Sequence, residues 1–138
     1  MLQQDYLVRM IMQLIDGIRQ SYLRAKGDND PLTAAELLEV SLEGATEIDS
    51  NLLLSLDPET MVGMLQLSDI DETVVEYVSR SLLLSSVYYH QAEQAHIATL
   101  REHQAYALAG AYDIVLNPES IEENNMEAFF ERTVSSLE

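Results

Sequence analysis

Cysteine is absent from the 138 residues of this chain. Its absence excludes a disulfide framework, a thiolate zinc site and a cysteine nucleophile. A chain without cysteine also suits a reducing compartment, so we expect a cytoplasmic protein.

Basic residues are scarce: 7 Lys and Arg stand against 24 Asp and Glu, for a net charge of −17. A surface of that sign repels phosphate backbones and anionic lipid headgroups, so neither nucleic acid nor a membrane is expected as a partner. Long apolar runs are absent too, because Asp5, Arg9 and Asp16 interrupt the apolar N-terminal stretch before a signal-peptide core or a membrane-length span can form. Since 47% of the residues are hydrophobic, we expect a folded globule with a charged surface.

Catalytic signatures are missing as well. The sequence has no glycine-rich phosphate loop, no G-x-S-x-G nucleophile elbow and no H-E-x-x-H pair. Runs typical of strands are brief and embedded in helical periodicity. We therefore expect an all-α fold, no cofactor and no catalytic residues.

Helix starts are marked by the 3 prolines, each of which follows an Asp or an Asn. Such a pair fits an N-cap residue followed by proline at the first helical position, where the missing N–H costs nothing. At the first pair, Thr33 and Glu36 have the spacing of a capping box and compete with Asp30 for the cap. The pattern predicts helices over residues 3–24, 32–43, 47–56, 58–67 and 118–137.

The predicted N-terminal helix carries an apolar stripe of helical period, formed by Leu7, Ile11, Leu14, Ile18 and Tyr22. Gly17 indicates a close contact with another helix, and Gly27 is expected at the position that ends the helix. Residues 1–27 also hold four of the 7 basic residues, whereas the remainder is strongly acidic. Such a helix can pack into its own body, which we favour, pair with a second copy as a homodimer, or dock on another surface.

A helical pattern without proline extends over residues 72–116. It is either one long helix or, as we expect, a hairpin of two helices that bends within HQAEQAH, residues 90–96. At its start, Asp69, Asp71 and Glu72 place negative charge where a helix macrodipole favours it.

The bend region contains all 3 histidines, and imidazole is a common metal ligand. Glu93 and His96 have the i, i+3 spacing of carboxylate-bridged di-iron bundles, but such sites need that pair twice and only one copy exists. His96 and His103 would lie about 10.5 Å apart along a helix, too far to share one ion. Solvated polar residues are the favoured interpretation, and a metal site of His90, Glu93, His96 and His103 is the alternative.

The opening QQDYLVRMIMQLIDGI contains Asp5, Tyr6, Arg9, Met10 and Ile11. It resembles the opening of a family of short all-helical bacterial proteins of uncharacterised function. The resemblance implies a bacterial, helical, cytosolic protein and carries over no functional residues.

The stretch LLLSSVYYHQAEQAHIATLREHQA is similar to a tetratricopeptide hairpin. Tyr88 and Tyr89 would stand near the end of the first helix, with Ala98 and Ala105 in the second. The glycine usual between the helices is absent, and no second copy follows at a period of about 34 residues.

These patterns predict a single all-α domain over residues 1–138, a helical bundle of about five to seven helices with a long amphipathic N-terminal helix and a tetratricopeptide-like hairpin. We expect a non-catalytic protein–protein interaction or adaptor module that binds a protein or peptide. Arg9 and Tyr89 are the candidate exposed contacts, and Leu14 is the candidate contact of a homodimer formed through the N-terminal helix. The alternative function is a metal-dependent enzyme or metal-binding protein.

Overall fold

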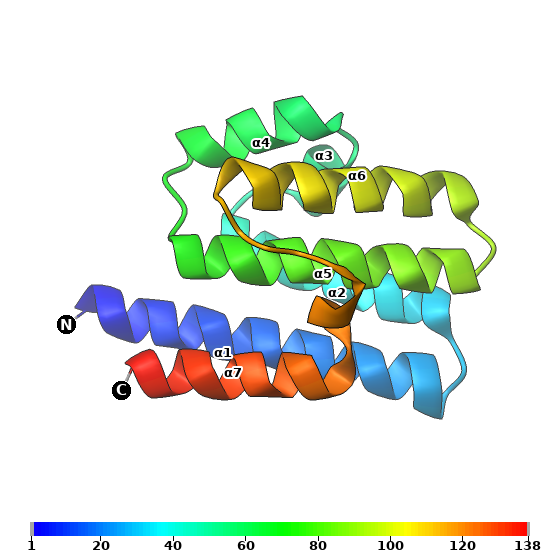
Figure 1. The fold of residues 1–138 in the computed structure, drawn as a ribbon, viewed down its shortest axis with the longest axis horizontal. Helices are drawn as coiled ribbons and strands as arrows, with labels where there is room; N and C mark the ends of the chain where they lie inside the picture. The colour runs from blue at the N-terminus through cyan, green and yellow to red at the C-terminus, as the bar shows by residue number, and fades with distance from the viewer. Residues whose placement is uncertain (1, 138) are drawn as a thin grey trace.

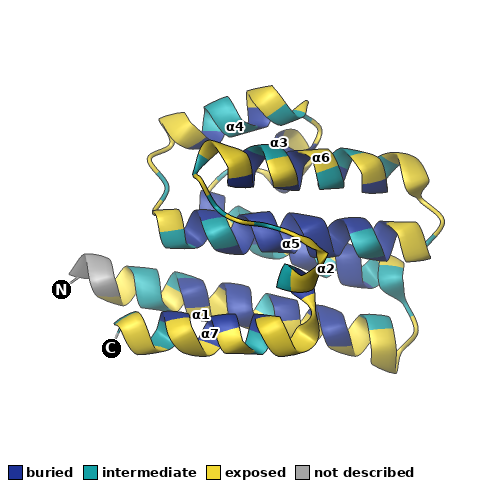
Figure 2. Ribbon diagram, viewed as in Figure 1, coloured by how far each residue is buried: buried dark blue, intermediate teal, exposed yellow. Residues whose placement is uncertain are grey.

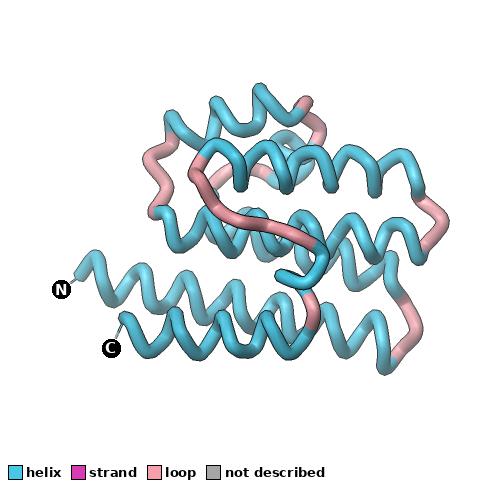
Figure 3. Tube along the Cα trace, viewed as in Figure 1, coloured by secondary structure: helices cyan, strands magenta, loops and turns pink. Residues whose placement is uncertain are grey.

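The computed structural model describes residues 2–137, and the side chains of residues 5–137, so the ends of the predicted domain, Met1 and Glu138, lie outside it. All regular structure within these residues is helical (Figure 3). The elements are α1 (Leu2–Tyr22), a π-helical turn η1 (Leu23–Gly27), α2 (Pro31–Thr46), α3 (Ser50–Leu54), α4 (Pro58–Leu67), α5 (Glu72–Gln91), α6 (Ala95–Ala111), a 3-10 turn η2 (Pro118–Ile121) and α7 (Glu123–Leu137). The predicted all-α bundle is confirmed.

Figure 1 shows how the helices are arranged. α1 and α7 run antiparallel along one edge, so both chain termini lie at the same end of the molecule. α5 and α6 form an antiparallel hairpin in the middle, α2 packs on α5, and α4 packs on α6. The hairpin bends at residues 92–94, within the predicted stretch, and Glu93 takes the left-handed conformation there with φ 62°. The likeness to a tetratricopeptide hairpin in particular stays a prediction.

The Asp and Asn residues before the prolines act as the predicted caps. The Asp30 side chain accepts a hydrogen bond from the Thr33 N–H at 3.1 Å, and Asp57 accepts one from the Thr60 N–H at 3.2 Å. Asn117 begins η2 in the same way. The competing start at Thr33 is therefore settled in favour of Asp30.

The N-terminal helix packs into its own body, as we favoured. In its stripe, Ile11, Leu14 and Ile18 are buried in a hydrophobic cluster that also takes residues from α2, α5 and α7. Figure 2 shows the central α5 mostly in the colour of buried residues, with exposed residues at its two ends. The close contact predicted at Gly17 is confirmed, because a Cβ there would stand 2.9 Å from the Cβ of Ser41 on α2.

Charge reinforces this packing. Arg19 of α1 pairs with Glu127 of α7 at 2.7 Å, and Lys26 of η1 pairs with Glu123 at 3.0 Å. All four side chains are substantially exposed, so each pair contributes at most about 1 kcal/mol. The contrast between a basic first segment and an acidic remainder is thus partly satisfied inside the molecule.

Several expected helix boundaries are wrong. The helix predicted over 47–56 spans only Ser50–Leu54, because α2 continues to Thr46 and Asp49 caps α3 through the Leu52 N–H at 3.1 Å. The chain after η1 reverses at Asn29, with φ 52°, and Gly27 has no positive φ. The run over 118–137 is divided by Glu122, which is extended with ψ 141°.

None of the described helices is long and apolar enough to cross a membrane.

Candidate binding groove

The candidate metal ligands do not converge. His90 lies in the last turn of α5, Glu93 lies in the bend, and His96 and His103 lie on α6, all four exposed. Residues 2–137 contain no group of three or more His, Cys, Asp or Glu side chains placed to hold one ion. The geometry gives the metal alternative no support.

Of the three candidate interaction residues, only Arg9 is exposed to a partner. Arg9 is exposed on α1. Leu14 is only 1% exposed, so it cannot meet a second copy without opening the core. The expected exposure of Tyr89 is wrong, because its side chain is buried and its hydroxyl donates to Glu39 Oε1 at 2.9 Å.

Tyr89 belongs to a buried polar network that joins α2, α5 and α6. Arg101 Nε donates to Glu39 Oε2 at 2.7 Å, and Arg101 Nη1 donates to the carbonyl oxygen of Leu54 at 2.8 Å. Ser85 donates to the same Glu39 carboxylate at 2.8 Å. Burial, with the Glu39 charge, raises the pKa of Tyr89 to about 12. Because every strong donor here has a partner within the chain, the network holds helices together and leaves nothing to offer a ligand.

A groove of about 680 Å³ is lined by residues from the start of α1 and the end of α7, among others. Figure 1 shows these two helix ends at the same end of the bundle. Four separate parts of the chain form the groove: the start of α1, the end of α2, the α4–α5 joint with the start of α5, and the end of α7. Its lining consists of Tyr6, Leu7, Met10, Ala45, Thr46, Glu47, Ser68, Asp69, Ile70, Asp71, Val74 and Leu137. We call this feature the end groove.

The end groove has an apolar floor. Leu7 and Met10 of α1 contribute from one side, Ile70 from the α4–α5 joint, and Leu137 from α7. All four side chains pack on the hydrophobic core but stay partly exposed, whereas Val74, which also lines the groove, is 1% exposed. Apolar side chains that converge in a concavity and remain partly exposed to solvent are typical of binding sites.

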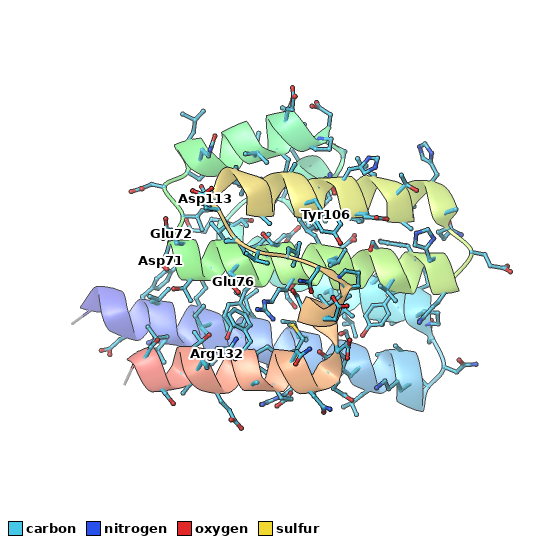
Figure 4. The ribbon with its side chains drawn as sticks, in the orientation of Figure 1. Asp71, Glu72, Glu76, Tyr106, Asp113 and Arg132 are labelled. Carbon is cyan, nitrogen blue, oxygen red and sulfur yellow. The ribbon has the colours of Figure 1, made fainter. Side chains whose placement is uncertain are left out.

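Three carboxylates lie around this floor, from Glu47, Asp69 and Asp71. The first is bound by Tyr6, whose hydroxyl donates to its Oε1 at 2.9 Å, and this hydrogen bond raises the pKa of Tyr6. Asp71, labelled in Figure 4, precedes α5 and accepts a hydrogen bond from the Thr73 N–H at 2.8 Å. None of the described residues that line the groove is basic.

Two of these acids occupy left-handed helix ends. Glu47, with φ 60°, follows α2, and Asp69, with φ 55°, follows α4. Glycine is the residue that adopts this conformation without cost. The end groove was not predicted from the sequence, because Glu47 was assigned to a helix, and Asp69 and Asp71 only to a cap. The missing signal is an acidic residue, in place of glycine, within two residues of a helix end.

A smaller cleft of about 360 Å³ lies between α5, the segment after α6, and α7. Figure 4 shows Glu76 on α5 and Arg132 on α7, both of which line it. The carboxylate of Glu76 is held by Arg80 at 2.9 Å, and the Arg80 guanidinium stands 3.9 Å from the centre of the Phe129 ring. Glu76 therefore serves the packing of α7 on α5 through Arg80, and the smaller volume makes this cleft the weaker candidate.

In comparisons with protein-family models, with curated proteins and with solved structures, no match to this chain was found.

Proposed function

We propose that this protein is a non-catalytic interaction module and that the end groove is where it binds a segment of another protein. The observation that supports this proposal is the partly exposed apolar floor formed by Leu7, Met10, Ile70 and Leu137. The end groove, with a volume of about 680 Å³, suits a few side chains of a peptide rather than a folded domain. We further propose that the protein acts in the cytoplasm, and the bacterial origin implied by its opening residues stays part of this proposal.

A homodimer through the stripe of the N-terminal helix is less well supported than binding to a different partner. The stripe is already covered by its own body, as Leu14 illustrates at 1% exposure. Two copies with a net charge of −17 each would also repel one another.

The test is a selection for binding peptides from a random peptide library, with the full chain as the target. Each selected peptide is then measured by calorimetry against Ile70→Ala, which removes apolar area from the floor without changing charge. The matched control is Leu67→Ala, three residues away, because Leu67 is 90% exposed and does not line the groove.

If the proposal is correct, selected peptides lose about tenfold in affinity for Ile70→Ala and none for Leu67→Ala, since deleting a buried aliphatic group costs over 1 kcal/mol. A library that yields no binder, or binders that do not respond to Ile70→Ala, would overturn it. Circular dichroism of both variants verifies that the helices are intact.

A further inference from the structure

The end groove combines an apolar floor with acidic side chains, and this combination indicates the chemistry of its occupant. Resting on the proposed function, we infer that the segment bound there is a basic amphipathic peptide, in which one or two aliphatic side chains are flanked by Lys or Arg. The aliphatic side chains would cover the floor formed by Leu7, Met10, Ile70 and Leu137. The cations would meet Glu47, Asp69 and Asp71 around it.

The charge of the end groove favours a cationic partner. Three carboxylates line it and no lining residue is basic, so none of these acids is neutralised by an ion pair within the described residues. Elsewhere in the described residues, five basic side chains form ion pairs with acids, as Arg19 does with Glu127. A cationic partner is what would complement the acids that remain.

The apolar floor excludes partners that are merely charged. A purely ionic ligand such as a polyamine would reach the carboxylates but would leave the floor without side chains to cover it. Anionic partners are disfavoured for the opposite reason, because nucleic acid, an acidic peptide or a second copy of this chain would bring more negative charge to the rim. The basic peptide is the one class that satisfies both parts of the groove.

The hydrogen bond from the Tyr6 hydroxyl leaves the Glu47 carboxylate able to bind a partner. It occupies one oxygen of Glu47, Oε1, and a carboxylate accepts several hydrogen bonds through its two oxygens. Asp69 has no hydrogen bond through its side chain within the described residues. These two acids are therefore the ones we expect to determine specificity, whereas Asp71 is partly committed to its helix cap.

The experiment uses three matched synthetic peptides with one central pair of leucines and with flanking Lys, Gln or Glu, together with spermidine as a charge-only probe. Each is titrated by calorimetry into the full chain and into Glu47→Gln, Asp69→Asn and Glu93→Gln. Glu93 is the matched control, since it is also an exposed glutamate in the left-handed conformation after a helix, at the α5–α6 bend.

We expect the Lys peptide to bind, the Gln peptide to bind about tenfold more weakly, and the Glu peptide and spermidine not to bind measurably. Glu47→Gln and Asp69→Asn should each weaken the Lys peptide by about two- to fivefold, as for single exposed charge pairs, and Glu93→Gln should leave it unchanged. Binding of the Lys peptide should also weaken with added salt.

Equal affinity for the Gln and Lys peptides, both sensitive to Ile70→Ala, would overturn the basic partner and leave the proposed interface in place. Equal weakening by Glu93→Gln and Glu47→Gln, or spermidine as strong as the Lys peptide, would mean general attraction to an acidic surface and would also overturn it. A Lys peptide that ignores Ile70→Ala would instead count against the end groove as an interface.

Discussion

Glu39 and Arg101 illustrate how single residues carry this fold. Their side chains are only 12% and 10% exposed, and the Glu39 carboxylate also accepts hydrogen bonds from Ser85 and Tyr89. A buried pair of this kind contributes little net energy over an apolar substitute, but removing one partner leaves the other as an uncompensated charge.

We therefore predict that Glu39→Ala lowers the free energy of unfolding by about 3–5 kcal/mol. The measurement is urea unfolding followed by circular dichroism. The matched control is Glu127→Ala, which also removes a carboxylate from an arginine, but where the side chains of Arg19 and Glu127 are 51% and 41% exposed. That variant should lose at most about 1 kcal/mol. Similar losses in both variants would contradict the role assigned to the buried network.

At the scale of the elements, the sequence predicted best where capping chemistry is local. The helix after Asp57 has the predicted bounds, Pro58–Leu67, because an Asp side chain and a proline act within one turn of each other. Helix ends were harder. Within residues 2–137, the five non-glycine residues with positive φ are Asn, Asp or Glu, four of them are acidic, and no glycine has a positive φ, so the usual glycine signal was absent. For that reason the end of the first helical segment was expected at Gly27, whereas Asn29 is the residue with positive φ there.

At the same scale, the sequence did predict a close contact of Gly17 with another helix, which is the contact between α1 and α2. Gly17→Ala would bring a Cβ against the side chain of Ser41, with 2.9 Å between the two Cβ atoms. Overpacking of this kind costs about 1–3 kcal/mol, which exceeds the roughly 1 kcal/mol that alanine gains over glycine within a helix. We predict a net loss of stability in urea unfolding.

The second variant makes this prediction specific. Ser41→Gly removes the atoms that a Cβ at Gly17 would meet. In the double variant Gly17→Ala, Ser41→Gly the cost of the alanine should disappear, leaving the cost of a glycine in α2 and a coupling energy of at least about 1 kcal/mol. Strictly additive effects would show that the helices do not meet at this point.

At the scale of the whole molecule, the end groove marks what the sequence could not predict. Its lining joins residues 6–10, 45–47, 68–74 and 137, which are distant in sequence and are brought together only by the packing of α1, α2, α5 and α7. Periodicity predicts which face of each helix is buried, but it does not predict how helix ends are placed relative to one another. The charge asymmetry had a whole-molecule meaning as well, since Arg19 and Lys26 pair with α7.

The acidity of the molecule leads to a prediction about pH. Hydrogen bonds from Thr33 hold the pKa of Asp30 below its ordinary value of 3.8, and Thr60 does the same for Asp57. A carboxyl whose pKa is lower in the folded than in the unfolded state adds stability above the unfolded pKa, and this stability is lost as the pH falls through the folded pKa. We therefore expect the urea midpoint to fall as the pH is lowered below 3.8.

The double variant Asp30→Asn, Asp57→Asn isolates this contribution, because asparagine caps helices about as well as aspartate but does not titrate. At pH 7 it should be slightly less stable than the natural chain, since each cap loses its charge at a helix N-terminus. Between pH 4 and pH 2 the urea midpoints of the two proteins should converge, because the natural caps become neutral there. Midpoints that stay a constant distance apart over that range would show that these two carboxylates do not govern the loss of stability in acid.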